Sequence, residues 1–223
     1  MKYFLFVSDA KVDMLLPQIP QESKSKLAAE IGVNVGVLSA KLKSEQDTGV
    51  KPDSISRLNA VSNFLRNTQN IGTVDEPEAW VEGTQDVRIV YPTSSRQAVF
   101  FVGRSETQTR FALAGSSAHL ISRKTSTDDI GWSFLPDLMI QLRAIFHTFE
   151  DSSITEELAD LSMSTVTSGY EFEWIDHVGA LEERATGPSM KVSFLAKRLL
   201  AGKHERLGFN AVLATPLYVA MEE

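Results

Sequence analysis

The sequence predicts an α+β fold in which a mainly antiparallel sheet packs with a few helices, as a single compact domain over residues 1–223. Short runs rich in β-branched and aromatic residues recur in the middle and C-terminal thirds, separated by turn residues. Single helical patterns interrupt these runs. No internal repeat, low-complexity tract or evident linker divides the 223 residues, a length that is long for one domain and short for two.

The first predicted strand, Tyr3–Val7, leads directly into Ser8, Asp9, Lys11 and Asp13. A hydroxyl, two carboxylates and an ammonium therefore gather where the strand ends, and rigid strand ends are common places for ligand-binding groups. In the functional interpretation, Lys11 binds or stabilises an anion while a carboxylate orients the ammonium. In the plainer interpretation, Ser8 caps a helix that begins here, and Lys11 forms a surface pair with Asp9 or Asp13.

Two helices and a strand are expected between this opening segment and the strand-rich middle. Residues 21–31 fit a short helix, residues 33–42 alternate as a strand, and residues 45–52 form a polar loop. Asp53 is a suitable N-cap for a helix that extends to about residue 68, because apolar residues recur there at spacings of three and four: Ile55, Leu58, Val61 and Leu65.

The rest of the chain is predicted as strands with one dominant helix. Four short strands are expected, with an antiparallel hairpin turning at residues 105–108: residues 80–82, 87–91, 99–102 and 110–114. Residues 133–149 carry the strongest helical pattern, which continues over residues 154–163. Strands then return at residues 170–175, 191–200 and 209–221. Residues 191–200 also fit a helix, and the flanking glycines and proline favour the strand.

A second candidate segment is Leu113-Ala-Gly-Ser-Ser-Ala-His-Leu-Ile121. Small residues let backbone amides approach a ligand, and successive N–H groups in a turn can cradle an anion. Ser116 or Ser117 would then supply a hydroxyl, and His119 a proton donor or acceptor. The segment matches neither a P-loop nor a nucleophile elbow. The alternative is a tight turn whose serines cap the next segment and whose histidine is an ordinary surface or half-buried ring.

The remaining histidines and arginines indicate no metal or cofactor. His147, His177 and His204 are dispersed without the spacing of a metal site, so we expect neither a metal ion nor a cofactor. Arg104 and Arg110 flank the predicted hairpin, where a hairpin salt bridge is favoured over contact with a ligand phosphate.

Composition and charge argue against several classes of binding partner and chemistry. A net charge of −7 and a pI near 5.2 argue against a nucleic-acid-binding surface, which normally needs a basic face. The absence of cysteine removes disulfides and thiolate catalysis. The apolar start breaks at Asp9 and Lys11, and no run approaches the roughly 18 apolar residues of a membrane span. We therefore expect a soluble cytoplasmic protein that does not contact membranes.

The segment Val7-Ser-Asp-Ala-Lys-Val-Asp-Met-Leu-Leu-Pro-Gln-Ile-Pro20 resembles an uncharacterised bacterial family, a domain of unknown function common in actinomycetes. Its members open with a similar Tyr-rich strand followed by Val-Ser-Asp-Ala-Lys-Val-Asp. Further similar stretches are Val102-Gly103, Gly115-Ser-Ser-Ala-His119, Phe194-Leu-Ala-Lys-Arg-Leu199 and Ala214-Thr-Pro-Leu-Tyr-Val-Ala220. The family usually has Gly-Gly-Ser-Ala-His where this chain has Ala114-Gly115-Ser116-Ser117, which weakens an argument from backbone flexibility there. The resemblance implies a single domain and supplies no activity.

Three functional hypotheses follow. The first is a ligand-binding or sensor module for a small anionic ligand, contacted by the two candidate segments through Ser8, Asp9, Lys11, Asp13, Ser116, Ser117 and His119. The second is a hydrolase or transferase that uses His119 as general base and Lys11 as electrostatic stabiliser. The third is a structural or assembly protein, including a homo-oligomer, joined through an exposed edge such as the C-terminal strand. The first is favoured because no triad order, metal spacing or nucleotide fingerprint occurs in the sequence.

Overall fold

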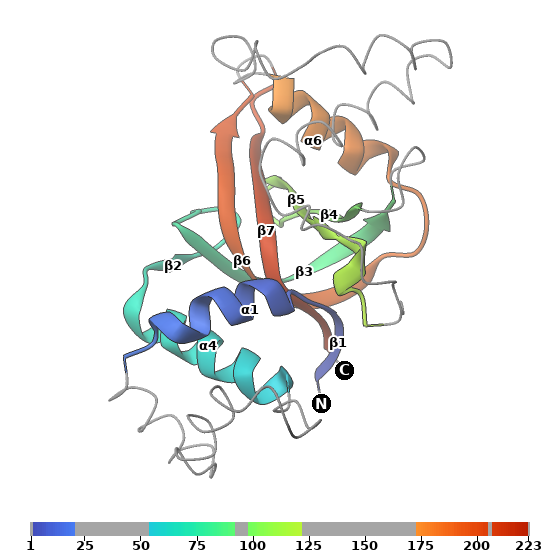
Figure 1. Ribbon diagram of the computed structural model, residues 1–223. Coiled ribbons are helices and arrows are strands. Elements are labelled where there is room, and N and C mark those ends of the chain that lie inside the picture. The colour runs from blue at the N-terminus through green and yellow to red at the C-terminus, as the bar shows by residue number, and fades with distance from the viewer. Residues whose placement is uncertain (1, 21–53, 92–97, 122–172, 205–206, 223) are drawn as a thin grey trace, which may run out of the picture. The chain divides into compact units, whose positions relative to one another are not determined.

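The computed structural model describes residues 2–20, 54–91, 98–121, 173–204 and 207–222 (Figure 1). Its contacts divide the chain into two compact units, one made of Met1–Val7 with Ile71–Glu223 and the other of Ser8–Asn70. The helix predicted at residues 21–31, the strand at 33–42, the helical residues 133–163 and His147 lie outside the described residues.

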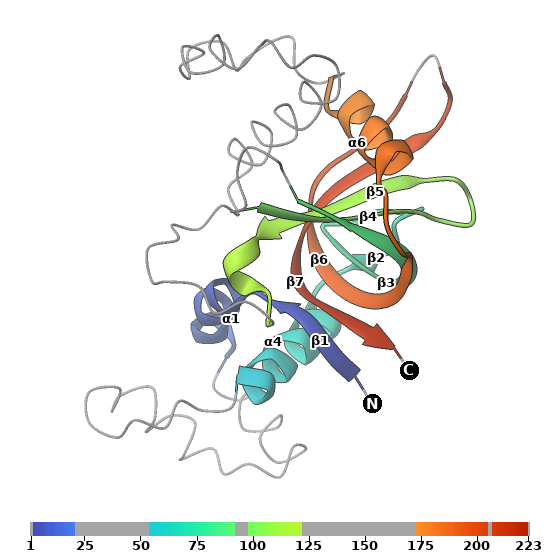
Figure 2. The ribbon, with the colours of Figure 1, turned by 90° about the vertical axis from the view of Figure 1, so that its right-hand side faces the viewer.

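Five strands of the larger unit close into a barrel. They are β3 (Trp80–Val90), β4 (Ala98–Arg104), β5 (Arg110–Ser116), β6 (Met190–Lys203) and β7 (Asn210–Glu222). β3 pairs with β4, β4 with β5, β5 with β7, β7 with β6, and β6 returns to β3. Figure 2 shows these strands curving around a common interior. A closed ring leaves these strands without the open edges of a flat sheet.

The length of two strands makes this closure feasible. The first part of β3 pairs with β6 over residues 80–87, and its last part pairs with β4 over residues 87–90. β7 likewise pairs in parallel with β5 over residues 211–214 and antiparallel with β1 (Lys2–Val7) over residues 218–222. Lys2 is the partner of Glu222, so the first residue of β1 lies beside the last residue of β7. A short strand, β2 (Ile71–Gly72), adds in parallel to β3.

The predicted α+β class is therefore wrong. The described chain is mostly β, its sheet is a closed barrel of mixed strand direction, and its helices are short. The strand segments themselves were predicted well, but the two strands expected at 80–82 and 87–91 form the single strand β3. Period-two patterning locates strands without saying which strand pairs with which. The apolar pattern of the sequence thus predicted where most of the strands lie and did not predict that they close into a barrel.

One predicted strand is a helix. α6 (Glu173–Arg184) begins within the segment expected as a strand at residues 170–175. Its apolar residues are buried and recur at helical spacing: Trp174, Ile175, Val178 and Leu181. The aromatic residues at the start of this segment favour a strand. The longer amphipathic pattern forms a helix instead, because its apolar residues pack on the outer face of the barrel.

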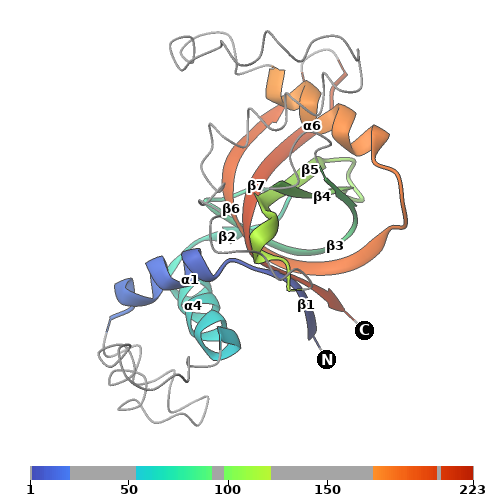
Figure 3. The same ribbon diagram turned by 45° about the vertical axis from the view of Figure 1, so that its right-hand side comes forward.

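The described residues of the larger unit form one apolar core inside the barrel and another outside it. Alternate residues of every barrel strand point inward, among them Val87, Phe101, Phe111, Phe194 and Val212, with Phe6 of β1 added to them. The opposite face of β4, β5 and β7 carries a second apolar set, which α6 covers (Figure 3). The members of that outer set include Phe100, Val102, Ala112, Ala114 and Leu213.

The smaller unit is helical where it is described. It contains α1 (Asp9–Leu15), a 3₁₀ turn η1 (Leu16–Gln18) and α4 (Ser54–Thr68), which confirms the helix predicted up to residue 68. α1 packs against α4, and Val12, Leu58, Val61 and Leu65 are buried. None of the helices in the described ranges is long and apolar enough to cross a membrane.

Candidate functional site

The opening candidate segment is a strand followed by a helix. β1 ends at Val7, Ser8 is the N-cap of α1, and Asp9 lies in the first turn of that helix. The Ser8 hydroxyl is buried and makes no capping hydrogen bond, so it does not play the capping role that the plainer interpretation expected. Asp13 forms an ion pair with Arg57 of α4 and therefore ties two helices of the smaller unit together.

Lys11 is the most perturbed titratable group of that segment. Burial lowers the pKa of its ammonium from 10.5 to about 7, because the charged form loses solvation. A lysine amine that is partly neutral at physiological pH is a stronger nucleophile and base than an exposed one.

The second candidate segment is organised by packing and capping. β5 extends through Ser116, and η2 (Ser117–His119) follows as a single 3₁₀ turn. The Ser116 hydroxyl accepts a hydrogen bond from the Ala118 amide at 3.3 Å, which is the capping role of the alternative interpretation. A Cβ at Gly115 would lie 2.6 Å from the ring of Phe6, so this glycine makes room for a core aromatic.

His119 is half-buried against the same aromatic ring. Its imidazole meets Phe6 edge to face, with ring centroids 5.6 Å apart, and Ser117 is buried. The segments around Lys11 and His119 belong to different compact units. A joint pocket formed by the two segments, and every role assigned to their seven residues, therefore stays a prediction.

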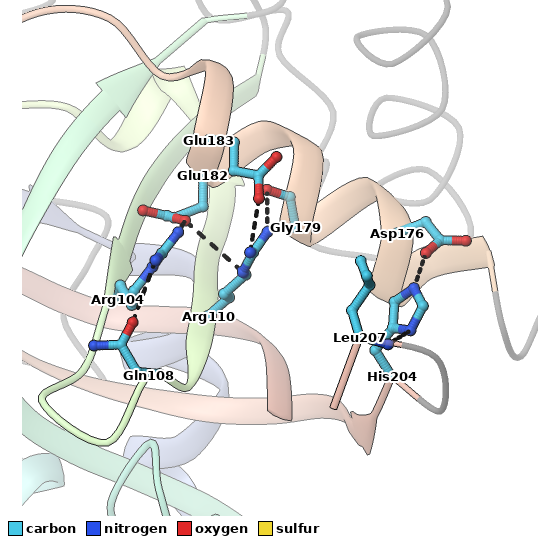
Figure 4. Close-up of polar contacts among 9 residues, drawn as sticks. All are labelled: Arg104, Gln108, Arg110, Asp176, Gly179, Glu182, Glu183, His204 and Leu207. Atoms are coloured by element: carbon cyan, nitrogen blue, oxygen red, sulfur yellow. Dashed lines mark hydrogen bonds and ion pairs between the residues drawn. The ribbon is translucent and has the colours of Figure 1, made fainter. Parts of the chain in front are cut away.

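A histidine and a carboxylate do meet elsewhere, at the turn between β6 and β7. His204 Nε2 lies 2.6 Å from Asp176 Oδ1 of α6, and the Leu207 amide donates to His204 Nδ1 at 3.1 Å (Figure 4). Both ring nitrogens are therefore engaged within the fold. A general base needs one nitrogen that faces its substrate, so this pair is suited to fastening the turn to α6.

Among the described residues of the larger unit, charged side chains gather where the β4–β5 hairpin meets α6. Arg104 and Arg110 are directly opposite each other across the two strands. Like charges at facing positions destabilise a strand pair unless anions compensate them. Figure 4 shows the guanidinium groups of both arginines directed toward carboxylates of the helix.

Two consecutive glutamates of α6 supply that compensation. Arg104 Nη2 and Nε donate to Glu182 Oε2 at 2.5 and 3.2 Å, and Arg104 Nη1 donates to Gln108 at 3.2 Å. Arg110 Nη2 lies 2.7 Å from Glu183 Oε1 and Arg110 Nε lies 4.0 Å from Glu182 Oε2. The predicted hairpin salt bridge is thus replaced by a bridge between the hairpin and a helix. We call these four charged residues the arginine–glutamate cluster.

Arg110 is also held in place by uncharged contacts. Its guanidinium lies over the ring of Phe209 at 4.1 Å, and Arg110 Nη1 donates to the Gly179 carbonyl at 3.2 Å. The exposed fractions of the side chains differ across the cluster, at 13% for Arg110, 9% for Glu182, 36% for Arg104 and 56% for Glu183. The cluster therefore has a fixed inner part and an outer part open to solvent.

The hairpin that carries both arginines is anchored at its tip. Asp75 accepts hydrogen bonds from the Ser105 hydroxyl at 2.5 Å and from the Thr107 hydroxyl. Burial alone raises the pKa of the Asp75 carboxyl, and the hydroxyl donors outweigh it, so the pKa lies below its ordinary value of 3.8. Because the tip is fixed, the two arginines at the base of the loop are presented on a rigid support.

Sequence patterning noted the arginines and missed their partners. Glu182 and Glu183 lie in a segment that was not recognised as a helix, and Phe209 was assigned only to a strand. The available signal was the helical spacing of Trp174, Val178 and Leu181. Recognising that spacing would have placed the two glutamates on the helix, immediately after the last residue of the apolar stripe.

No three histidine, aspartate or glutamate side chains of the described residues gather as metal ligands. The arginine–glutamate cluster, with two cations and two anions, offers anion-binding rather than metal-binding chemistry.

The barrel has the topology of a known ligand-binding architecture. Counted along the chain, its strands follow the ring order first, second, third, fifth, fourth, and α6 lies between the third and the fourth in the sequence. This is the arrangement of the oligonucleotide/oligosaccharide-binding barrel, a small Greek-key barrel that binds ligands on the outer face of its second and third strands. Those strands are β4 and β5 here, and their outer face is the one that α6 covers.

A family model matches nearly the whole chain. The model of a family described as a family of unknown function (DUF7019) matches residues 2–223, which confirms the expected resemblance to a domain-of-unknown-function family. No curated protein and no solved structure matches the chain.

Proposed function

The chain belongs to this family of unknown function (DUF7019), and we propose that it acts as a binding module for a small anionic ligand, with Arg104 and Arg110 as the anion-binding groups. The observation that carries the proposal is the facing position of these two arginines on the β4–β5 hairpin. A planar guanidinium presents two parallel N–H donors, which match the oxygens of a phosphate or carboxylate group.

The location of the arginines supports this proposal. They stand at one end of the β4–β5 face, which is the ligand-binding face in barrels of this topology. Fold-level analogy alone does not assign a function, so the weight rests on the side chains. Two cations opposite each other cost free energy in a sheet unless an anion accompanies them. Glu182 and Glu183 are the anions that accompany them in this structure, and the binding of Glu182 Oε2 by two nitrogens of Arg104 supports the proposal that a ligand anion takes these positions.

The charge of the chain indicates a small ligand. A net charge of −7 repels an extended polyanion at long range, whereas a local pair of arginines still attracts a compact anionic group at short range. A compact phosphate-bearing molecule satisfies both conditions better than a nucleic-acid strand.

The proposal is tested by titrating the protein with inorganic pyrophosphate in a calorimeter. Arg104→Gln removes the more exposed arginine, and we expect affinity to fall roughly tenfold or more because a charge-assisted hydrogen-bond pair is lost. Arg104→Lys keeps the positive charge and loses the paired N–H donors of the guanidinium. Its affinity for pyrophosphate should therefore lie between that of the wild type and that of Arg104→Gln.

The matched control is Lys197→Gln, which removes one positive charge from an exposed residue of β6 that lies over the ring of Trp80. Its affinity should equal that of the wild type after correction for net charge. Equal losses in Arg104→Gln and Lys197→Gln would mean that pyrophosphate binds through general charge, and the proposed site would then be abandoned.

A further inference from the structure

The arginine–glutamate cluster already contains two anions in the positions that a ligand would take. Glu182 binds Arg104 through two nitrogens, and Glu183 binds Arg110 through one. Glu182 and Glu183 are consecutive residues of α6, so their two carboxylates are held together as a pair of linked negative charges. A ligand that uses both guanidinium groups must replace both carboxylates.

We infer that Glu182 and Glu183 are an internal competitor for the anion site, and that a diphosphate group displaces them and releases the last turn of α6. This inference rests on the proposed function, because it concerns the same two arginines. It specifies the ligand class, since two linked anionic groups are needed to match two linked carboxylates. It also specifies a response of the protein to binding.

The last turn of α6 is the part of the helix that can leave at low cost. The buried apolar stripe of the helix ends at Leu181, and Ala185 just beyond the helix is only partly buried against the outer core. The contacts of Glu182 and Glu183 with the barrel are ionic. Glu183 is exposed, so its ion pair contributes little net stability, and the loss of the buried Glu182 pair is offset when a ligand anion takes the place of the carboxylate. Uncovering the apolar stripe has no such compensation and would cost several kcal/mol. Release is therefore confined to the terminal turn.

The exposure of the cluster gives the order of displacement. Glu183 is 56% exposed and Arg104 is 36% exposed, so an incoming anion meets these two groups first. Glu182 and Arg110 are the inner groups, at 9% and 13%. Binding begins at the outer edge of the cluster and replaces Glu182 last.

The experiment measures pyrophosphate affinity in Glu183→Gln, a change at an exposed position that should leave the fold intact, and in Glu182→Gln. Each variant removes one competing carboxylate, so affinity should rise several-fold over the wild type. Asp176→Asn is the matched control, because it removes the same charge from the same helix at the carboxylate paired with His204. Its affinity should stay close to that of the wild type.

Amide hydrogen exchange supplies the second readout. In the wild type, saturating pyrophosphate should speed exchange over residues 182–185 and leave residues 174–181 protected. Parallel titrations with ADP and with an oligothymidylate distinguish a free diphosphate group from the separated phosphates of a strand, and only the first should bind with the variant dependence described above.

The outcomes separate the two proposals. Equal binding of pyrophosphate to the wild type and Glu183→Gln, with unchanged exchange in α6, would keep the anion site and overturn the internal competitor. Binding by none of the proteins would overturn both. Tighter binding by the two glutamate variants alone, with faster exchange in the last turn, would support both.

Discussion

At the scale of single residues, Lys11 shows how the environment of a side chain carries information that its sequence neighbours do not. The sequence places it among Ser8, Asp9 and Asp13, which suggested a hydrated cluster of charges. In the structure Asp13 pairs with Arg57, and the surroundings of Lys11 lower its pKa to about 7. Burial rather than a neighbouring charge dominates this amine.

This pKa makes the stability of the folded chain depend on pH. In the unfolded chain the amine binds its proton up to about pH 10.5, and in the folded chain only up to about pH 7. The unfolded state therefore binds more protons between these values, and the free energy of unfolding should rise with pH across that interval, by at most about 1.4 kcal/mol per pH unit. Lys11→Met should abolish the rise and stabilise the protein at pH 6.5 by about 1 kcal/mol or more.

Urea unfolding at pH 6.5, 8 and 9.5 measures this dependence for both proteins. Lys197→Met, which changes an exposed lysine in the same way, should keep the rise. A wild-type curve that is flat between pH 7 and 10 would show that the Lys11 amine is solvated in the folded chain.

At the scale of secondary-structure elements, the sequence predicted strands and helices well where the apolar pattern within the element itself marks the buried face. β6, β7 and α4 were predicted close to their observed ends, and the hairpin between β4 and β5 was predicted at its turn. α6 was missed because Trp174 and Ile175 follow an aromatic run, and their burial depends on a barrel face built by strands far away in the chain. The arginine partners were missed with it.

Gly103 of β4 tests how closely the barrel strands must approach each other. A Cβ at Gly103 would overlap the backbone carbonyl oxygen of Asp86 on β3 and lie 2.8 Å from the ring of Phe111. Neither the strand backbone nor a fully buried ring can yield easily, so Gly103→Ala should lower the free energy of unfolding by about 1–3 kcal/mol.

The matched control is Gly83→Ala on β3. A Cβ at that position would meet the ring of Phe194 at 3.6 Å, which is an ordinary van der Waals contact. Its stability in urea should stay within about 0.5 kcal/mol of the wild type. If both variants lost a similar free energy of unfolding, the close approach of β3 and β4 at Gly103 would not be the reason that glycine is needed there.

At the scale of the whole molecule, the barrel closes through strands that are far apart in the sequence, β3 with β6 and β5 with β7, and β1 adds to β7 over a still longer separation. β1 precedes the smaller unit in the chain, yet it pairs with β7, the last strand. Strand pairing over this separation leaves no local pattern in the sequence, which is why the alternation of apolar residues indicated a sheet and could not indicate a ring. The strand at residues 2–7 is therefore part of the larger unit.

Phe6 is the residue through which the N-terminal strand contributes to the barrel core. Its side chain is fully buried, and its ring meets Phe101 edge to face at 6.0 Å and fills the space that Gly115 leaves. Phe6→Ala should therefore lower the free energy of unfolding by about 3–5 kcal/mol, as expected for a cavity left by a buried aromatic ring. Tyr3→Ala, on the same strand but at 65% exposure, should cost less than about 1 kcal/mol. Because the core is continuous across the five barrel strands, circular dichroism and tryptophan fluorescence should report the same shifted midpoint in Phe6→Ala. Two separate transitions would instead show that β1 detaches alone and that the barrel of residues 71–223 holds together without it.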